Sequence, residues 1–588
     1  MKTPSILSTI QQLRALLTRK EKIEWLGILV FAFCTGFLEI FTALVIIVFV
    51  QVLNQPKIGL TYLAKVGIVN GFVFSEEQLV FYAAVFLGIV YLVKNGIAAL
   101  EVFYQNFTIQ RMNSDFKSKL LHRYSCTDYG FYLTRNSSLG IQVISSDVEL
   151  VFAIALIAVA GLLSESVVAF CLLGVLVYMN PFLALMILSV SAVFGFFVAK
   201  GLFPLLYRWG QVIQTASLQS VRNLMQFFHG FKEIVISGHQ DSFMQAYRHH
   251  IYKKSRLQAI QTATNALPRM AIEVLFMGLL VGTIAFLCLG HAEPAQIMAI
   301  LSGYLYAGFR LMPGLNRILG HLSVFKAQSP SIERVYAEYN AVPMREVYCD
   351  APNFAFDQSI DLNQVSFRYL NAHDEALRSI SLKLKKGECV GIVGETGSGK
   401  STLVDVILGL LQPQRGTVLI DGQFSAYSHQ WHHKIGYVPQ AIYLTDDTIA
   451  ANIAFGERSI DDARLKDSIE AAQLTRFIVE LPDGVKTIVG ERGVRLSGGE
   501  QQRIAIARAL YRNPAVLIFD EATSALDNDT ESRLMETIYR VSQHRTVIMI
   551  AHRITTLKQC DRILVMEKGE IKDITTYQDL QNSQDNRQ

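Results

Sequence analysis

Charged side chains are scarce in this sequence: Asp, Glu, Lys and Arg make up only 18% of its 588 residues, against roughly a quarter in average soluble proteins. Their balance is also close to neutral, with a formal net charge of +4. Because nucleic-acid-binding domains carry strongly basic surfaces, this charge gives no support for a nucleic-acid partner. Hydrophobic residues instead supply 51% of the chain, which indicates that part of it lies in a membrane.

Cysteine is also rare, and its placement excludes two kinds of protein. The seven cysteines stand singly, and their spacing matches neither a metal site nor a disulfide framework; they are Cys34, Cys126, Cys171, Cys288, Cys349, Cys389 and Cys560. We therefore expect all of them to be reduced.

Long apolar stretches dominate the first half of the chain. They cover residues 23–53, 79–107, 150–179, 181–200, 267–290 and 295–320. Each is long enough to cross a hydrocarbon core of about 30 Å as a helix. The first lacks a small-residue cleavage site, so we expect an anchor and not a removable signal peptide. We predict an α-helical transmembrane domain of six helices over residues 1–325.

The distribution of basic residues predicts the orientation of these helices. The connection 54–78 has two Lys or Arg residues, whereas 108–147 has five and 200–263 has eight. Loops rich in Lys and Arg stay in the cytoplasm, so both termini should lie there. The two basic connections have helical apolar patterns, which predicts that the membrane helices extend well into the cytoplasm.

The second half has the pattern of an α/β domain. Ser329-Pro330, Pro343 and Pro352 suggest a linker over residues 326–358. From residue 359 to 588, short β-rich runs alternate with helical patterns, as in a domain built on a parallel sheet.

A phosphate-binding loop stands near the start of this domain. The segment Gly394, Glu395, Thr396, Gly397, Ser398, Gly399, Lys400, Ser401 and Thr402 follows a predicted strand and precedes a predicted helix. Backbone N–H groups in such a loop point at phosphate oxygens. Lys400 should hold the β- and γ-phosphates and Ser401 the Mg²⁺. The loop thus predicts ATP and Mg²⁺ as ligands.

Two further segments complete the expected chemistry. The apolar strand before Asp520 and Glu521 ends in carboxylates that suit Mg²⁺ binding by Asp520 and activation of water by Glu521. Ser497, Gly498 and Gly499 begin a predicted helix, whose N-terminus favours anions.

Together these segments resemble the ATP-binding-cassette transporters, specifically exporters of the type IV kind with one membrane half and one cassette in each chain. This resemblance covers residues 359–575 and implies further roles. It assigns adenine stacking to Tyr369, nucleotide binding to Asp527 and γ-phosphate contact to His552. It also implies that Gln440 couples the γ-phosphate and Mg²⁺ to the membrane half. It also places Ser497–Gly499 across a dimer interface. Since each element occurs once in the chain, we expect a dimer, most simply a homodimer.

Three arginines in the predicted spans bear on the cargo. Arg269, Arg310 and Arg317 are costly in a membrane, at about 2.5–3.5 kcal/mol each when uncompensated. Arg310 and Arg317 are seven residues apart and share a helix face. In one interpretation they bind an anionic head group in a cavity. In the other they lie at cytoplasmic helix ends or pair with Glu39, Glu101, Glu165 or Glu273.

A narrower resemblance favours the first interpretation. Residues 266–270 and 309–318 are similar to segments of bacterial lipid-linked oligosaccharide flippases of the PglK family. The resemblance implies that the arginines bind the pyrophosphate of the lipid, and that the apolar segment 58–69 forms a short external helix. The implied function is ATP-driven flipping of a polyprenyl-pyrophosphate-linked glycan across the bacterial inner membrane. Export of another lipid, a peptide or a drug is the alternative; we expect no peptidase domain before the first helix.

Overall fold

The chain forms two compact units. The computed structural model describes residues 4–54, 76–179, 181–289, 294–343, 354–370, 372–521, 528–542, 545–551 and 553–585. The first unit comprises Met1–Ser125 and Asn136–Pro343, and the second comprises Cys126–Arg135 and Met344–Gln588. The external helix predicted at 58–69 lies outside the described residues.

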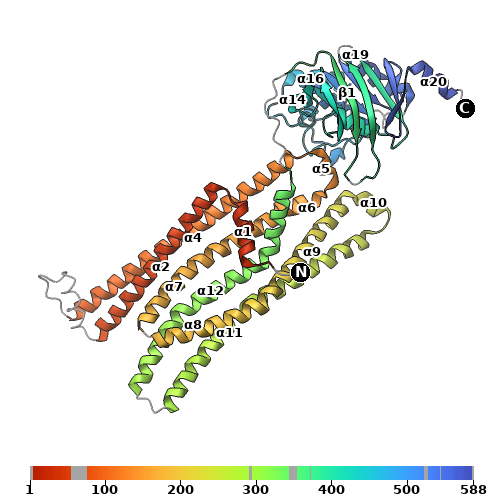
Figure 1. Ribbon diagram of the computed structural model, residues 1–588. Coiled ribbons are helices and arrows are strands. Elements are labelled where there is room, and N and C mark those ends of the chain that lie inside the picture. The colour runs from red at the N-terminus through yellow and green to blue at the C-terminus, as the bar shows by residue number, and fades with distance from the viewer. Residues whose placement is uncertain are drawn as a thin grey trace. The chain divides into compact units, whose positions relative to one another are not determined.

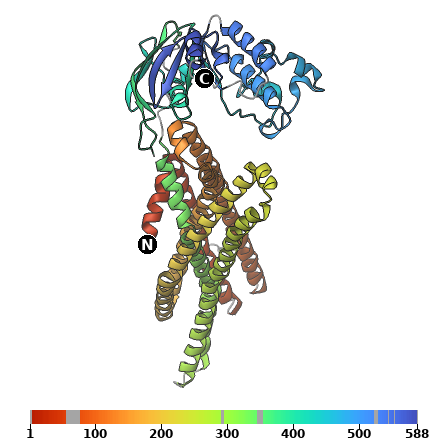
Figure 2. The same cartoon turned by 90° about the vertical axis from the view of Figure 1, so that its right-hand side faces the viewer.

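The first unit consists of helices that run alongside one another (Figures 1 and 2). They are α1 (Ile6–Leu16), α2 (Arg19–Asn54), α4 (Glu76–Ser125), α6 (Ser137–Gln142), η1 (Val143–Asp147), η2 (Leu150–Leu156), α7 (Ile157–Met179), α8 (Pro181–Phe197), η3 (Val198–Leu202), α9 (Phe203–His229), α10 (Phe231–Ile236), α11 (Gln240–Leu289) and α12 (Pro294–Ala341). The π-helical turns η1, η2 and η3 continue directly into neighbouring helices, so the predicted spans at 150–179 and 181–200 are parts of longer helical runs.

Several of these helices are much longer than a membrane requires. Helices α4 and α11 each contain 50 residues, which corresponds to about 75 Å at 1.5 Å per residue. A hydrocarbon core takes only about 30 Å of that length. Each of these helices therefore has room for a span and for a long extension beyond it.

The outward surfaces of the first unit suit a lipid environment. Phe37 on α2, Leu92 on α4 and Phe170 on α7 are each more than two-thirds exposed, an arrangement that water would penalise. Within the described residues, five helices are long and apolar enough to cross a membrane: Arg19–Ile46, Glu77–Ser125, Ser137–Gly174, Leu188–His229 and Gln240–Ala285. The sixth predicted span, 295–320, falls in α12, where the side chains of residues 294–311 are not described.

Residues 326–341 are not the linker that the sequence analysis expected, because α12 continues through them to Ala341. Pro330 lies inside this helix, and a proline there removes one backbone hydrogen bond. Burial outweighs that cost: Ser329 and Ile332 are fully buried. The Lys326 ammonium also donates to the carbonyl of Pro4 at 2.6 Å. Tertiary packing thus carries the helix past a residue that usually ends one.

The second unit combines two sheets with surrounding helices (Figure 1). Its strands are β1 (Ser359–Phe367), β2 (Leu377–Lys385), β3 (Cys389–Gly394), β4 (Arg415–Ile420), β5 (Phe424–Ser425), β6 (Ile435–Val438), β7 (Val516–Asp520), β8 (Thr546–Ile550), β9 (Arg562–Glu567) and β10 (Glu570–Thr575). Its helices are α5 (Tyr129–Thr134), α13 (Lys400–Ile407), α14 (His429–His432), α15 (Ile449–Ile453), α16 (Asp462–Ala471), α17 (Thr475–Glu480), η4 (Gly484–Lys486), η5 (Glu491–Gly493), α18 (Gly498–Tyr511), α19 (Asn528–Ser542), η6 (Ile554–Leu557) and α20 (Tyr577–Asp585).

The larger sheet has the strand order β10-β9-β3-β8-β7-β6. All its pairs are parallel except β9 with β10. The smaller sheet is antiparallel, in the order β2-β1-β4-β5. Strand β8 lies between β3 and β7 and is parallel to both. The loops that follow β3 and β7 therefore emerge from the same edge of the sheet. This topology brings together the segments that carry the predicted site.

Alternating side chains bury both faces of the larger sheet. On β7, Val516 and Ile518 join one apolar core, whereas Leu517 and Phe519 join the other. The period of two places successive side chains on opposite faces. A parallel strand covered on both sides is therefore apolar along its whole length, as β7 is.

Trp431 offers a test of how the core around α14 is held. Its ring is fully buried, and its indole N–H donates to the carbonyl of Ile407 at 2.8 Å. Replacement of a buried Trp by Ala costs about 3–5 kcal/mol through lost packing and the cavity left behind. Trp431→Ala should therefore lower the temperature at which this unit unfolds, measured by thermal denaturation of the full chain in detergent. Val479→Ala, at a side chain that is 79% exposed, is the control and should change little.

Candidate ATP site

The phosphate-binding loop connects β3 to α13 and depends on two glycines. Gly394 has φ of 156° and Gly399 has φ of 100°. A Cβ at Gly394 would stand 2.3 Å from the carbonyl oxygen of Met566, and one at Gly399 would stand 2.6 Å from that of Ala376. Both positions therefore exclude any side chain. The close approach presses the loop against β9 and the start of β2.

Lys400 and Ser398 give the loop its polar interior. The Lys400 ammonium is buried and donates to the carbonyl oxygens of Gly394 and Glu395, at 2.8 and 2.9 Å. The Ser398 hydroxyl is also buried and has no hydrogen-bond partner among the described residues. A buried group without a partner is costly. A glycine-lined loop with a lysine and an unsatisfied donor fits a phosphate chain as its ligand.

Carboxylates face the loop from the end of β7. Asp520 is 8% exposed and accepts a hydrogen bond from the hydroxyl of Tyr437, on the adjacent strand β6, at 3.3 Å. Burial raises the pKa of Asp520, and the Glu521 carboxylate raises it further, while Lys400 opposes the shift. Burial and Asp520 together raise the pKa of Tyr437. The Asp520 carboxylate thus lies in a poorly hydrated position that a cation would stabilise.

Glu521 is held in an unusual conformation beside Gln440. Its φ is +51°, a left-handed conformation that costs free energy for a residue with a side chain. Its backbone N–H donates to the carbonyl of Ile550 at 3.0 Å. The Gln440 amide donates to its carboxylate at 2.6 Å. Gln440 follows β6 and Glu521 follows β7, so the parallel pairing of these strands brings the two side chains together.

The oxygen groups of Ser401, Gln440 and Asp520 are hard donors of the kind that Mg²⁺ prefers. Among the described residues there is no group of three His, Cys, Asp or Glu side chains that could hold a metal ion alone. Mg²⁺ usually binds one or two carboxylates together with phosphates. The donor set fits that mode.

Of the remaining predicted residues, Tyr369 contacts the end of the loop, whereas the others lie apart from it or outside the described chain. The Tyr369 hydroxyl lies 3.1 Å from that of Thr402, and its ring packs edge-on against Phe367. Ser497 caps α18, and its hydroxyl accepts from the N–H of Glu500. Among the described residues, no hydrogen bond joins Ser497, Gly498 or Gly499 to the phosphate-binding loop. Asp527 and His552 lie outside the described residues.

Asp405 and Tyr437 are neighbours of the site that the sequence analysis missed. Burial, and secondarily Asp520, raises the pKa of Asp405 on α13 to about 6. Asp405 lies one helical turn after Ser401, a spacing that could have indicated a place near the site. Tyr437 had no such signal, because a tyrosine in a buried strand is usually a core residue.

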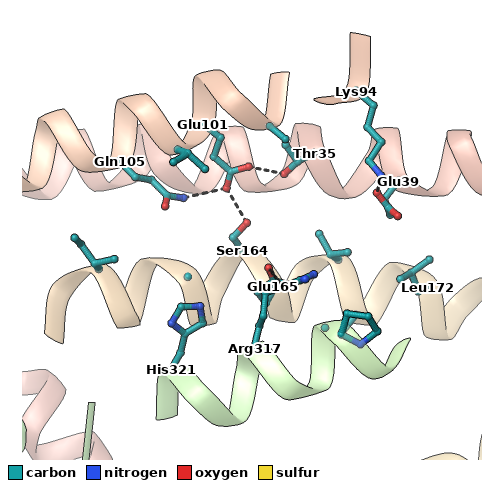
Figure 3. A pocket seen from close by; sticks show the side chains of 18 of the residues that line it. Thr35, Glu39, Lys94, Glu101, Gln105, Ser164, Glu165, Leu172, Arg317 and His321 are labelled. Atoms are coloured by element: carbon teal, nitrogen blue, oxygen red, sulfur yellow. Dashed lines mark hydrogen bonds and ion pairs between the residues drawn. The ribbon is translucent and has the colours of Figure 1, made fainter. Parts of the chain in front are cut away.

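A second polar region lies in the first unit. It is a cavity of about 530 Å³ lined by residues of α2, α4, α7 and α12 (Figure 3). Charged side chains of both signs line it: Glu39, Lys94, Glu101, Glu165 and Arg317. Lys94 forms an ion pair with Glu39, and Arg317 Nε donates to Glu165 Oε1 at 2.5 Å.

The structure separates the three predicted arginines. Arg317 lines the cavity and is paired with Glu165. Arg269 does not line it and pairs with Glu273 one turn further along α11, where both side chains are at least half exposed. The side chain of Arg310 lies outside the described ones, although its backbone is part of α12. Lys94 was missed, although a lysine inside the apolar stretch 79–107 was a visible signal.

The raised pKa of Asp405 makes a prediction about stability. A carboxyl that titrates near pH 6 in the folded state and near 3.8 when unfolded binds its proton more tightly when folded. Its contribution to stability is therefore present below pH 3.8 and is lost as pH rises to about 6. Asp405→Asn should stabilise the protein at pH 7, and this gain should shrink as pH falls toward 4. Thermal denaturation against pH measures it, with the exposed Asp374→Asn as control; a gain independent of pH would contradict the assignment.

Comparisons with known proteins agree with this architecture. Residues 25–297 match the ABC transporter transmembrane region, and residues 377–524 match the ABC transporter family. An ATP-dependent lipid A-core flippase of Saccharophagus degradans is 31% identical over 490 residues, 81% of each chain. Another, of Syntrophus aciditrophicus, is 28% identical over 540 residues, 89% of this chain and 87% of its own.

Among solved structures, a bacterial Atm1-family ABC exporter with ATP bound has the same fold. It superposes with a TM-score of 0.77 at 23% identity and covers 96% of this chain and 97% of its own. The predicted membrane domain followed by an α/β nucleotide-binding domain is therefore confirmed. The chain belongs to the ABC transporter family, as an ATP-hydrolysing exporter with one multi-pass membrane domain and one cassette.

Proposed function

We propose that this exporter flips a lipid with a phosphate-bearing head group, specifically a polyprenyl-pyrophosphate-linked glycan, from the cytoplasmic to the outer leaflet of the bacterial inner membrane. The observation that carries the proposal is the polar cavity of the first unit, which Arg317 lines. A cavity of about 530 Å³ is within the usual range for small-molecule sites. Polar side chains at membrane depth suit a head group and not an acyl chain.

The Arg317 guanidinium is suited to an anionic oxygen. Only its Nε is engaged by Glu165, and the side chain is 54% exposed. Its Nη1 and Nη2 make no hydrogen bond to the described residues, so these two amino groups are available to a ligand. Arginine binds phosphate through two parallel hydrogen bonds, which favours this chemistry over recognition of an apolar drug.

The relatives support a lipid as cargo. Two proteins that align over most of this chain are named lipid A-core flippases. A lipid A-type lipid is therefore the second candidate. The similarity of residues 266–270 and 309–318 to segments of the lipid-linked oligosaccharide flippases favours the pyrophosphate lipid. Reconstitution with both lipids separates the two candidates.

In the proposed cycle, two identical chains pair and complete two ATP sites. Lys400 and the loop N–H groups hold the phosphates. Ser401, Gln440 and Asp520 would hold Mg²⁺, which would neutralise charge on the phosphate oxygens. Glu521 orients the attacking water and takes its proton. Ser497–Gly499 of the other copy close the site.

Glu521→Gln tests the catalytic part of the proposal. The substitution keeps the size of the side chain but removes the base, so ATP turnover should fall by at least 100-fold while ATP still binds. The variant should accumulate as an ATP-bound dimer, measured by ATPase assay and by size-exclusion chromatography with light scattering. Vigorous hydrolysis by a dilute monomeric variant would contradict both the role of Glu521 and the dimer. Glu536→Gln, on α19, is the control.

Reconstitution in liposomes tests the cargo. A polyprenyl-pyrophosphate glycan, a lipid A-type lipid and a hydrophobic peptide are each offered to the wild type, and ATPase stimulation and leaflet transfer are measured. We expect the pyrophosphate glycan to give the largest response. Arg317→Ala and Arg310→Ala should each reduce its transfer by at least tenfold, because each removes a charge-assisted contact.

Arg476→Ala is the matched control for these variants, since Arg476 pairs with Glu480 one turn away on the exposed face of α17. It should leave transfer unchanged. Intact transfer by both the Arg317 and the Arg310 variant would show that these arginines do not bind the head group. A larger response to the lipid A-type lipid would replace the proposed cargo with the second candidate.

A further inference from the structure

Glu101 is the most deeply buried carboxylate of the cavity. It lies on α4 and is 5% exposed. Its Oε1 accepts from Ser164 Oγ at 2.7 Å and from Gln105 Nε2 at 3.0 Å, and its Oε2 lies 2.8 Å from Thr35 Oγ1. Figure 3 shows these three side chains converging on it from α7, α4 and α2. Its position is thus fixed by three neighbouring groups.

Glu101 differs from the other carboxylates of the cavity in the kind of group that it contacts. Glu39 is paired with Lys94 and Glu165 with Arg317. Within the described part of the chain, the hydrogen-bond partners of Glu101 are neutral hydroxyl and amide groups. A carboxylate offers about four acceptor positions, of which these bonds use three. One acceptor position remains for a ligand.

Glu101 and Arg317 line the same cavity. Ser164, which donates to Glu101, directly precedes Glu165, which holds Arg317. The cavity therefore contains both hydrogen-bond donors for an anion and an acceptor for a hydroxyl group.

We propose that Glu101 accepts hydrogen bonds from the hydroxyl groups of the sugar attached to the phosphate, so that the cavity recognises the sugar as well as the phosphate. This inference rests on the proposed function. It adds that the cavity contacts the sugar of the substrate and not only its phosphate. An ionised pyrophosphate has no proton to donate to a carboxylate and is repelled by its charge. A sugar hydroxyl is a donor and carries no charge. Glu101 thus favours a glycan-bearing lipid over the bare lipid pyrophosphate.

A purely structural role for Glu101 makes a different prediction. Its contacts to Thr35 and Ser164 connect α4 to α2 and α7. If joining these helices were its only role, its replacement would destabilise the membrane domain and impair every lipid equally. The preference between two lipids would not change. The ratio of their KM values therefore separates the two roles.

The experiment compares a polyprenyl-pyrophosphate glycan with bare polyprenyl pyrophosphate as stimulants of ATP hydrolysis in liposomes. For the wild type we expect a lower KM for the glycan lipid. Glu101→Gln should raise the KM for the glycan lipid about tenfold, with kcat unchanged, because a charge-assisted hydrogen bond is lost. Its KM for the bare lipid should stay the same or fall. Glu273→Gln, on α11 outside the cavity, should change neither value.

If Glu101→Gln fails to fold, Glu101→Asp keeps the charge but withdraws the carboxylate by one methylene, and should also lose the preference for the glycan lipid. An unchanged ratio of KM values in a folded variant would overturn the inference while leaving the proposed function intact. Stimulation of the wild type by neither lipid would contradict the proposed function itself, and this inference with it.

Discussion

The cost of removing charge from water governs both units of this protein. In the first unit, Lys94 with Glu39 and Arg317 with Glu165 pair charges at a cavity within long apolar helices. In the second, Lys400 lies close enough to Asp520 to oppose the rise in its pKa. A buried charge needs a partner or hydrogen bonds. Each site therefore contains groups of opposite charge that stabilise one another. A ligand that brings charge or hydrogen-bond donors changes the electrostatic balance between these groups.

The predicted nucleotide site was drawn from local patterns in the sequence. Gly394 and Gly399 are required by positive φ and by close backbone approach, so no other residue can stand there. Asp520 and Glu521 follow an apolar strand, a pattern that indicates its position in a parallel sheet. These features depend on residues that are close together in the sequence or that stand at the end of a strand. Both can be recognised from the sequence alone. The general fold followed from the same kind of information.

The features that were not predicted depend on contacts between distant parts of the chain. Glu101 meets Thr35 and Ser164 at separations of 66 and 63 residues, and Arg317 meets Glu165 at 152. The sequence analysis named Glu165 only as one of several partners, because helix spacing cannot show which helices lie together. The end of α12 was misplaced for the same reason. In the sequence alone, Pro330 indicates the end of a helix. In the structure α12 continues through it, because the residues around it are buried.

The pairing of Arg317 with Glu165 does not exclude a role for Arg317 in binding a head group. A lysine ammonium is a point charge without the planar fork of arginine, so it cannot offer a phosphate two parallel hydrogen bonds. Arginine has five N–H donors on three nitrogens, and Glu165 engages only Nε. Glu165 therefore holds the guanidinium through Nε, while Nη1 and Nη2 make no hydrogen bond within the described part of the chain. The carboxylate also reduces the cost of keeping the arginine in the membrane domain when no phosphate is bound. The pair is thus compatible with the proposed contact to a head group, which a lysine at position 317 would not reproduce because it lacks the two parallel N–H donors.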